Sequence, residues 1–265
     1  MLSGRSLEEA ADRSQAEIQR DEARHAEGGV VVEERGVLLC RGAGRLPVTP
    51  NTVMPLDTVD PDDLFDQAET FFGERQAGYT LHLRLGDVDD HFVAPAHARR
   101  PLHQIDAPAM VVHRPLATGP PLGADVALRT VVDPAGTAAY AAVVDDAYQS
   151  LGWPPGGPAT LFAPPGLLLQ PNKVAFVAFV DGTPAAAASV SVTEGLGLVS
   201  WVGTTVAARG HGLGRAVTVA ATNAGFELGA SDVWLAASDM GASLYRHLGY
   251  EEFGRSRGFV LWPGL

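Results

Sequence analysis

The stretch Arg209-Gly210-His211-Gly212-Leu213-Gly214 decides the fold of this chain, because it joins an apolar, strand-like segment to an amphipathic helix. Three glycines within five positions let a backbone wrap closely around a phosphate, since no Cβ blocks the approach and positive φ angles are open to glycine. A helix that begins directly after such a loop turns its unpaired amides and the positive end of its dipole toward the same point. The stretch therefore predicts a site for the pyrophosphate of a nucleotide-like cofactor.

The segments on either side of this loop have the patterns of a buried strand and of a helix packed on one face. Residues 198–206 are apolar and rich in β-branched side chains, as expected of a buried strand. After the loop, apolar residues recur at three- and four-residue spacing until Gly229, which is placed to end the helix. A strand at 233–237 and a short helix capped by Ser238 or Asp239 follow.

These elements resemble the GNAT superfamily of acyl-CoA N-acyltransferases. The superfamily signature Arg/Gln-x-x-Gly-x-Gly/Ala is matched by Arg209, Gly212 and Gly214. A second family element, Asn-x-x-Ala-x-x-Leu-Tyr-x-x-x-Gly-Phe, is matched by 238–250, which reads Ser-x-x-Gly-x-x-Leu-Tyr-x-x-x-Gly-Tyr. The resemblance covers residues 125–262 and implies an α/β (α+β) fold, with a mixed, mostly antiparallel sheet flanked by helices.

Other phosphate-binding and catalytic motifs do not fit the chain. A dinucleotide fingerprint requires Gly-x-Gly-x-x-Gly after the first strand of a βαβ unit and an acidic residue about twenty positions later. A P-loop requires Gly-Lys-Ser/Thr, and the only lysine is Lys173. No Gly-x-Ser-x-Gly of a serine hydrolase occurs, and the scattered histidines lack the spacing of metal ligands, so we expect no metal site.

Composition points to a globular protein. The chain has 265 residues, enough for one large domain or two small ones, and is 46% apolar and 19% charged. No apolar run approaches the roughly 18 residues of a membrane span, and residues 1–28 lack the apolar region of a secretory signal. The single cysteine, Cys40, is most simply a small buried hydrophobe in a reduced setting. We therefore expect a cytoplasmic protein without a membrane partner.

The formal net charge of −12 bears on the class of partner. Nucleic acid is disfavoured, because its phosphate backbone requires a basic face. An acidic field would suit a cationic amine by steering, although the same charge is also ordinary for a soluble protein.

The N-terminal part follows the order helix, hairpin, helix, strand, irregular segment, strand. The helices are expected at 5–26 and from Asp60-Pro61 onward, the hairpin at 30–40, and the strands at 79–85 and 110–112. This order is similar to a degenerate half of a tandem GNAT protein. No Arg/Gln-x-x-Gly-x-Gly occurs before residue 120, so such a unit should not bind the cofactor in the usual way.

The Pro/Gly-rich stretch 115–123 reads as a linker between two domains. We expect an N-terminal α/β domain, possibly a degenerate GNAT-like one, at 1–118, and a GNAT-type catalytic domain at 119–265. In the second domain a helix is expected at 134–150. Strands are expected at 126–132, 174–180, 186–192, 198–206, 233–237 and 258–262.

The resemblance implies which residues hold the cofactor. Backbone amides from Gly210 to Arg215 would anchor the pyrophosphate, and the edge of the strand at 202–204 would hold the pantetheine arm. The side chains of His211 and Arg215 could also touch phosphate oxygens. The full expected set is Val202, Gly203, Thr204, Arg209, Gly210, His211, Gly212, Leu213, Gly214, Arg215 and Ser238.

Tyr245 matches the family position whose phenol protonates the departing thiolate, and its alternative is a packing aromatic. The general base is open: Glu194 is the nearest carboxylate to the strand, and a water relay is the alternative. Trp153 and Tyr148 fall near helices that line the acceptor pocket in the family, and both would also serve as core residues.

The resulting hypothesis is an N-acyltransferase that moves an acetyl group from acetyl-CoA to a small amine or a peptide N-terminus, as a monomer or homodimer. The alternative is a catalytically silent GNAT-like protein that binds acyl-CoA or another protein. The glycine loop and Tyr245 favour the enzyme, whereas Ser238 in place of asparagine favours the alternative.

Overall fold

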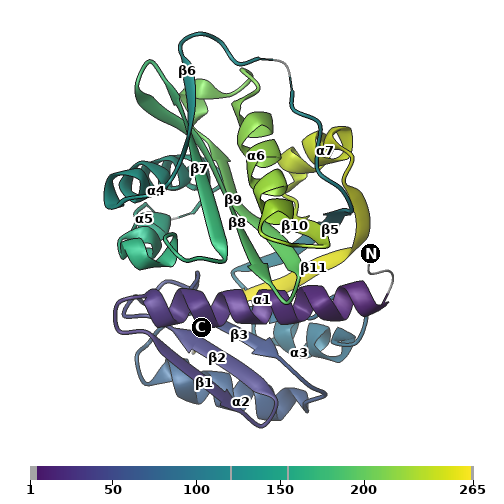
Figure 1. Ribbon diagram of the computed structural model, residues 1–265. Coiled ribbons are helices and arrows are strands. Elements are labelled where there is room, and N and C mark those ends of the chain that lie inside the picture. The colour runs from purple at the N-terminus through teal and green to yellow at the C-terminus, as the bar shows by residue number, and fades with distance from the viewer. Residues whose placement is uncertain (1–4, 120, 154, 264–265) are drawn as a thin grey trace. The chain divides into compact units, whose positions relative to one another are not determined.

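The computed structural model describes residues 5–119, 121–153 and 155–263, which form two compact units (Figure 1). One unit consists of residues 110–251. The other consists of 5–109 together with the C-terminal segment 252–263.

The unit of residues 110–251 contains a sheet of the order β5-β10-β9-β8-β7-β6. Strand β9 pairs in parallel with β10, whereas β8 is antiparallel to both of its neighbours, β9 and β7. The strands are β6 Val126–Thr130, β7 Lys173–Val180, β8 Thr183–Thr193, β9 Leu196–Thr204 and β10 Asp232–Ala236, together with the end of β5 His103–Val112.

Helices cover both faces of this sheet: α4 and α5 lie on one side, and α6 and α7 on the other (Figure 1). The alternation of side chains along β8 serves both cores, because Ala187 packs under α4 and α5 while Ala186 and Ala188 pack under α6 and α7. The helices are α4 Pro134–Gln149, α5 Gly157–Phe162, α6 Leu213–Glu227 and α7 Asp239–Leu248, and short 3₁₀ turns occupy η2 Pro165–Leu167 and η3 Val206–Ala208.

Local signals explain most of these elements. Asp133 caps α4 by accepting a hydrogen bond from the amide of Gly136 at 2.7 Å, and Pro134 fills the first turn. The expected strands and the helices after the glycine loop are present, with shifts of a few residues at their ends. Helix α5 was not predicted, because it begins in residues 153–158, whose several prolines and glycines are typical of a loop.

The unit of residues 5–109 and 252–263 contains a sheet of the order β1-β2-β3-β4-β11-β5. Its strands are β1 Val30–Glu34, β2 Val37–Arg41, β3 Thr52–Pro55, β4 Tyr79–Leu83 and β11 Glu251–Leu261, with most of β5. Its helices are α1 Arg5–His25, α2 Pro61–Gly73 and α3 Val93–Ala98, and η1 Asp90–Phe92 is a 3₁₀ turn.

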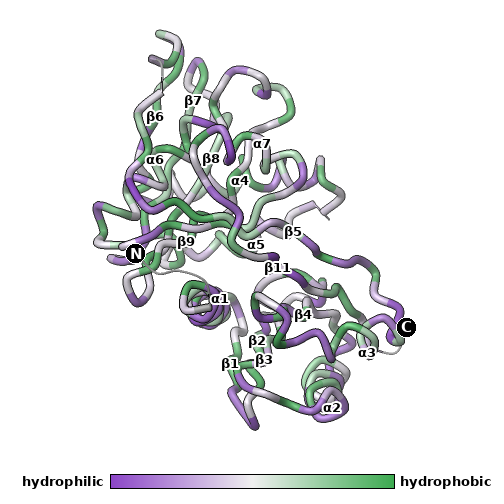
Figure 2. The backbone as a smooth tube through the Cα atoms, turned by 90° about the vertical axis from the view of Figure 1, so that its right-hand side faces the viewer, coloured by the Kyte–Doolittle hydropathy of each residue, from purple (hydrophilic) through white to green (hydrophobic). Residues whose placement is uncertain are grey.

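Hydropathy distinguishes the elements of this unit. Helix α1, seen end-on in Figure 2, is largely hydrophilic, whereas the core gathers around Phe65 and Phe72 of α2. Cys40 is fully buried in β2, as expected, and burial raises the pKa of its thiol to about 12. Strand β3 was not predicted, because it has only four residues, too few for a clear alternating pattern.

The last strand corrects the expected assignment of the C-terminal residues. We placed it within the second domain, but residues 257–261 of β11 pair antiparallel with residues 79–83 of β4, in the other unit. An alternating pattern shows that a strand has one buried face, but it does not show which strand lies beside it. Strand β5 likewise begins in one unit and ends in the other.

Among its described residues, the expected linker 115–123 is held to α6 at Leu116. The side chain of Asn223 in α6 accepts from the amide of Leu116 at 2.7 Å and donates to its carbonyl at 3.0 Å. Across the described residues, the helices are all too short or too polar to traverse a lipid bilayer.

Candidate functional site

The site begins where two parallel strands stop pairing. Strand β10 is in register with β9 only from Asp232 opposite Leu196 to Trp234 opposite Leu198. Beyond Leu198, no described residue of β10 pairs with β9, so the edge of β9 toward Thr204 keeps its backbone groups available.

A cavity of about 320 Å³ lies beside this unpaired edge. It takes its walls from the end of α4, the end of β9, the glycine loop with the first turn of α6, and the first turns of α7. The lining residues are Ala147, Tyr148, Leu151, Val202, Gly203, Thr204, Ala208, Arg209, Gly210, Gly212, Leu213, Gly214, Arg215, Ser238, Met240, Gly241, Leu244 and Tyr245.

The glycine loop depends on backbone conformations that other residues rarely adopt. Gly210 has a φ of +82° and Gly212, at the N-cap of α6, a φ of +76°. The guanidinium of Arg209 donates to the carbonyl of Thr204 and to the hydroxyl of Ser150, which ties the loop to β9 and to the end of α4.

The loop and the helix that it opens form an anion-binding geometry. No described residue accepts a hydrogen bond from the backbone amides between Gly210 and Arg215. Helix α6 is 15 residues long, and the positive end of its dipole faces the same cavity. Free amides, a helix N-terminus and the side chains of Arg209 and Arg215 therefore all favour a negatively charged group here.

Tyr245 reaches the cavity from α7. A Cβ on Gly241 would lie 2.8 Å from the ring of Tyr245, so the glycine one turn earlier leaves space for that ring. Burial raises the pKa of Tyr245 to about 12, and no described residue forms a hydrogen bond with its hydroxyl. At neutral pH the phenol is a protonated donor at the cavity wall.

A β-bulge in β9 sets the backbone next to the cavity. The register with β8 shifts between Ala187 opposite Gly203 and Ser189 opposite Ser200, so one residue of β8 faces two of β9. Trp201 within the bulge has a φ of +55°, which costs a bulky residue about 1–3 kcal/mol.

The strained Trp201 joins an aromatic cluster, defined here as Tyr148, Trp153, Phe162 and Trp201. The ring of Trp201 lies 5.2 Å from Tyr148, 5.9 Å from Trp153 and 5.4 Å from Phe162, measured between centroids. Phe162 is buried, while the other three rings are partly exposed. Tyr148 belongs to both the cluster and the cavity wall, and burial, with the nearby Tyr245, raises the pKa of its phenol.

Most of the residues expected from the sequence meet at this cavity. Eleven of the twelve expected binding and catalytic residues line it, and His211 does not: it is exposed, and its ring lies against the carbonyl of Ala208. The hydroxyl of Ser238 accepts from the amide of Gly241, so it caps α7 as well as lining the cavity.

Glu194, the carboxylate nearest to the strand in sequence, does not line the cavity. Glu194 sits in the turn before β9, and the nine residues of that strand separate it from Thr204 by roughly 30 Å. Among the residues that line the cavity, the charged ones are Arg209 and Arg215, and no carboxylate is present.

Sequence reasoning missed the walls that packing supplies. Ala147 comes from α4, Leu151 from the turn that follows it, and Met240 from α7, all outside the glycine loop. The apolar face of α4 was a signal for burial only. The Leu-Tyr pair of the second family element was the one pattern that pointed to Leu244.

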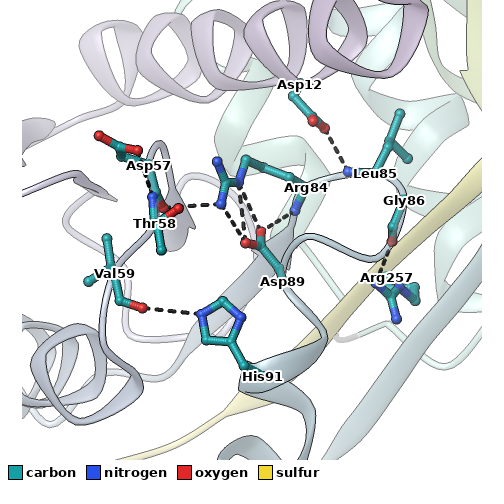
Figure 3. Close-up of polar contacts among 10 residues, drawn as sticks. All are labelled: Asp12, Asp57, Thr58, Val59, Arg84, Leu85, Gly86, Asp89, His91 and Arg257. Atoms are coloured by element: carbon teal, nitrogen blue, oxygen red, sulfur yellow. Dashed lines mark hydrogen bonds and ion pairs between the residues drawn. The ribbon is translucent and has the colours of Figure 1, made fainter. Parts of the chain in front are cut away.

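The other unit has a strand–loop–helix junction of opposite chemistry after β4 (Figure 3). Asp89 is fully buried and accepts from the amide of Arg84 at 2.8 Å and from its guanidinium at 2.7 Å. Asp12 of α1 accepts from the amide of Leu85 at 2.9 Å. Arg257 donates to the carbonyl of Gly86 at 2.6 Å. The amides that follow β4 are therefore already paired with carboxylates of the chain itself.

Comparisons with known proteins identify the fold. No protein-family model and no curated protein sequence matches the chain. Among solved structures, a GCN5-related N-acetyltransferase from Kribbella flavida is 22% identical with a TM-score of 0.67, over 95% of each chain. A tandem GNAT protein from the clavulanic acid biosynthesis pathway is 17% identical with a TM-score of 0.60, over 100% of this chain and 98% of its own.

A third structure, a GCN5-related N-acetyltransferase from Sphaerobacter thermophilus, is 17% identical with a TM-score of 0.61, over 87% of this chain and 82% of its own. The chain thus has a GNAT fold, and the mixed, mostly antiparallel sheet expected from the sequence is confirmed. The match to a tandem protein extends over both units.

Proposed function

We propose that residues 110–251 bind an acyl-CoA and transfer its acyl group, most simply acetyl from acetyl-CoA, to an amine. The observation that carries the proposal is the cavity at the unpaired edge of β9, with free amides and a helix N-terminus at one end and Tyr245 at the other. The GNAT fold of the whole chain supports the same class of reaction.

The residues present are suited to the parts of this co-substrate. The amides from Gly210 to Arg215 and the dipole of α6 would hold the pyrophosphate. The unpaired edge of β9 at 202–204 would form backbone hydrogen bonds with the amide-containing pantetheine arm, in the manner of an added strand.

The chemistry requires two proton movements. When bound, acetyl-CoA supplies a thioester: the amine nitrogen forms a bond to the carbonyl carbon, and the carbon–sulfur bond breaks with its electron pair on sulfur. Tyr245 holds a proton that can pass to this sulfur, because its pKa of about 12 keeps the phenol protonated. The amine loses its proton to water, since no carboxylate lines the cavity.

The first test is calorimetric titration of the full chain with acetyl-CoA at modest salt, followed by an assay for free thiol with a panel of amines. We expect saturable binding at one site and thiol release that depends on the amine. Absence of binding by the folded protein would contradict the proposal.

A second variant separates catalysis from binding. Tyr245→Phe should lower kcat by about 100-fold or more, the usual contribution of a positioned proton donor, and leave the affinity for acetyl-CoA unchanged. Tyr79→Phe is the matched control, because Tyr79 is a buried tyrosine of the other unit and does not line the cavity. Equal turnover of Tyr245→Phe and the parent protein would exclude the acid role.

A further inference from the structure

The aromatic cluster beside the cavity packs against the core and also leaves ring surface exposed. Phe162 lies beneath Trp201 and is 2% exposed, so it is a core residue. Tyr148, Trp153 and Trp201 remain partly exposed at the surface of the unit. Tyr and Trp combine a large apolar ring with a polar tip, so partly exposed rings that lie together offer surface that a ligand can cover.

Two features connect this ring surface to the cavity. Tyr148 belongs both to the aromatic cluster and to the cavity wall. Trp201 lies in the bulge directly before Val202, where the part of β9 that lines the cavity begins. The apolar surface continues at the cavity itself, where Leu151 is 47% exposed and Met240 is 58% exposed. A contiguous apolar patch at a cavity mouth is typical of a ligand-binding surface.

The geometry of the cluster selects the kind of group that it can hold. The ring centroids are 5.2–5.9 Å apart, which is direct contact, so the rings leave no space for an ammonium group between them. The charged residues of the cavity are arginines, which would repel a second cation. The outer faces and edges of the rings suit a flat apolar group instead.

We propose that the aromatic cluster binds the acceptor, and that the acceptor is an amine carrying an aromatic ring. This inference rests on the proposed function and deepens it by naming the substrate class. The ring of the acceptor would lie against Trp153 and Trp201, with its amine directed past Tyr148 toward the end of the cavity at Tyr245.

The test uses 2-phenylethylamine as the aromatic probe, and butylamine and 1,4-diaminobutane as probes that lack a ring. Binding of each amine to the full chain is followed by intrinsic tryptophan fluorescence and by saturation-transfer NMR, with and without saturating CoA. We expect 2-phenylethylamine to bind at least about tenfold more tightly than either of the others, from the area of one aromatic ring.

Variants locate the binding surface. Trp153→Ala should weaken the binding of 2-phenylethylamine about tenfold, and Trp153→Phe should retain most of it. Val132→Ala is the control, because Val132 is 74% exposed in the same unit and does not line the cavity. Affinity for acetyl-CoA should be the same in all three variants.

The outcomes distinguish the two proposals. Equal binding of butylamine and 2-phenylethylamine, no saturable binding of the latter, or equal loss of both in Trp153→Ala would overturn the aromatic acceptor while acetyl-CoA still binds. Aromatic binding that Trp153→Ala weakens, in a protein that does not bind acetyl-CoA, would retain the ring-binding surface and reject the acyltransferase.

Discussion

The two units of this chain each carry a strand, a loop and a helical segment in sequence, and the two junctions bind charge in opposite ways. After β9, the backbone amides of the glycine loop have no acceptor among the described residues, and a 15-residue helix points its positive end at a cavity. After β4, the amides of Arg84 and Leu85 donate to the carboxylates of Asp89 and Asp12 (Figure 3). The junction after β9 offers free amides to an external anion, whereas the junction after β4 pairs its amides with carboxylates of the chain itself.

The difference arises from a few residues. The loop after β4 contains Asp87, Asp89 and Asp90, whereas the loop after β9 contains three glycines, and the helix after β4, α3, has only six residues. Carboxylates at this place would repel a phosphate, and a short helix has little dipole to attract one. A strand–loop–helix junction therefore offers its amides to an external anion only where the loop carries no carboxylate of its own.

The largest expected effect comes from a substitution in the glycine loop after β9. Gly212→Asp should weaken acetyl-CoA binding by about 100-fold or more, because it puts a β-carbon at a positive φ and a negative charge at the helix N-terminus. Calorimetry measures the loss.

The matched control is Gly229→Asp, which alters a glycine with a φ of +94° just after the other end of α6. Unchanged affinity of Gly212→Asp for acetyl-CoA would remove the loop from the binding site.

The next largest effect is on the free energy of unfolding and comes from removing a carboxylate of the junction after β4. Asp89→Ala leaves the guanidinium and the amide of Arg84 without their shared partner and should lower the free energy of unfolding by about 3 kcal/mol. Urea denaturation measures this cost, with the exposed Asp63→Ala on α2 as control. The affinity of the folded variant for acetyl-CoA should be unchanged, and a parallel fall in that affinity would mean that this junction takes part in binding.

The smallest expected effect is the pH dependence of stability that Asp12, beside the junction after β4, produces. Burial, the largest cause, and the neighbouring charges of Asp89 and Glu8 raise the pKa of Asp12 from 3.8 to about 7, although Arg84 and the amide of Leu85 act in the opposite direction. The folded state therefore holds this proton more tightly than the unfolded chain. The resulting stabilisation is complete below about pH 4 and is lost as the pH rises through about 7.

Asp12→Asn mimics the neutral form and should make the protein more stable than the parent at pH 8.5, by about 1–2 kcal/mol more than at pH 5.5. The comparison is made by urea denaturation at the two pH values, with the exposed Asp66→Asn as control. A difference of the opposite sign, or none, would show that Asp12 is ionised in the folded protein at neutral pH.

Much of the fold could be predicted because its signals are local. The helical periodicity after Gly212, the helix start at Asp60-Pro61 and the alternation at 79–85 each depend on neighbouring residues. The two helices formed where they were expected, and the strand formed at 79–83. Helix α5 and strand β3 could not, because their short sequences contain the residues that usually mark loops. The pairing of β11 with β4 is a contact between residues about 180 positions apart, and no local pattern specifies it.

The residues of the candidate site also divide into those that local sequence predicts and those that tertiary contacts bring together. By itself, the sequence determined the glycine loop and Tyr245, because a loop that binds phosphate needs consecutive backbone groups and a family motif keeps its spacing. Only the tertiary structure decided that β9 and β10 part at Leu198, that Glu194 lies at the far end of its strand, and that Trp201 meets Tyr148. Strand register, a bulge and the packing of α4 on the sheet set these contacts, and they join residues that are distant in the chain.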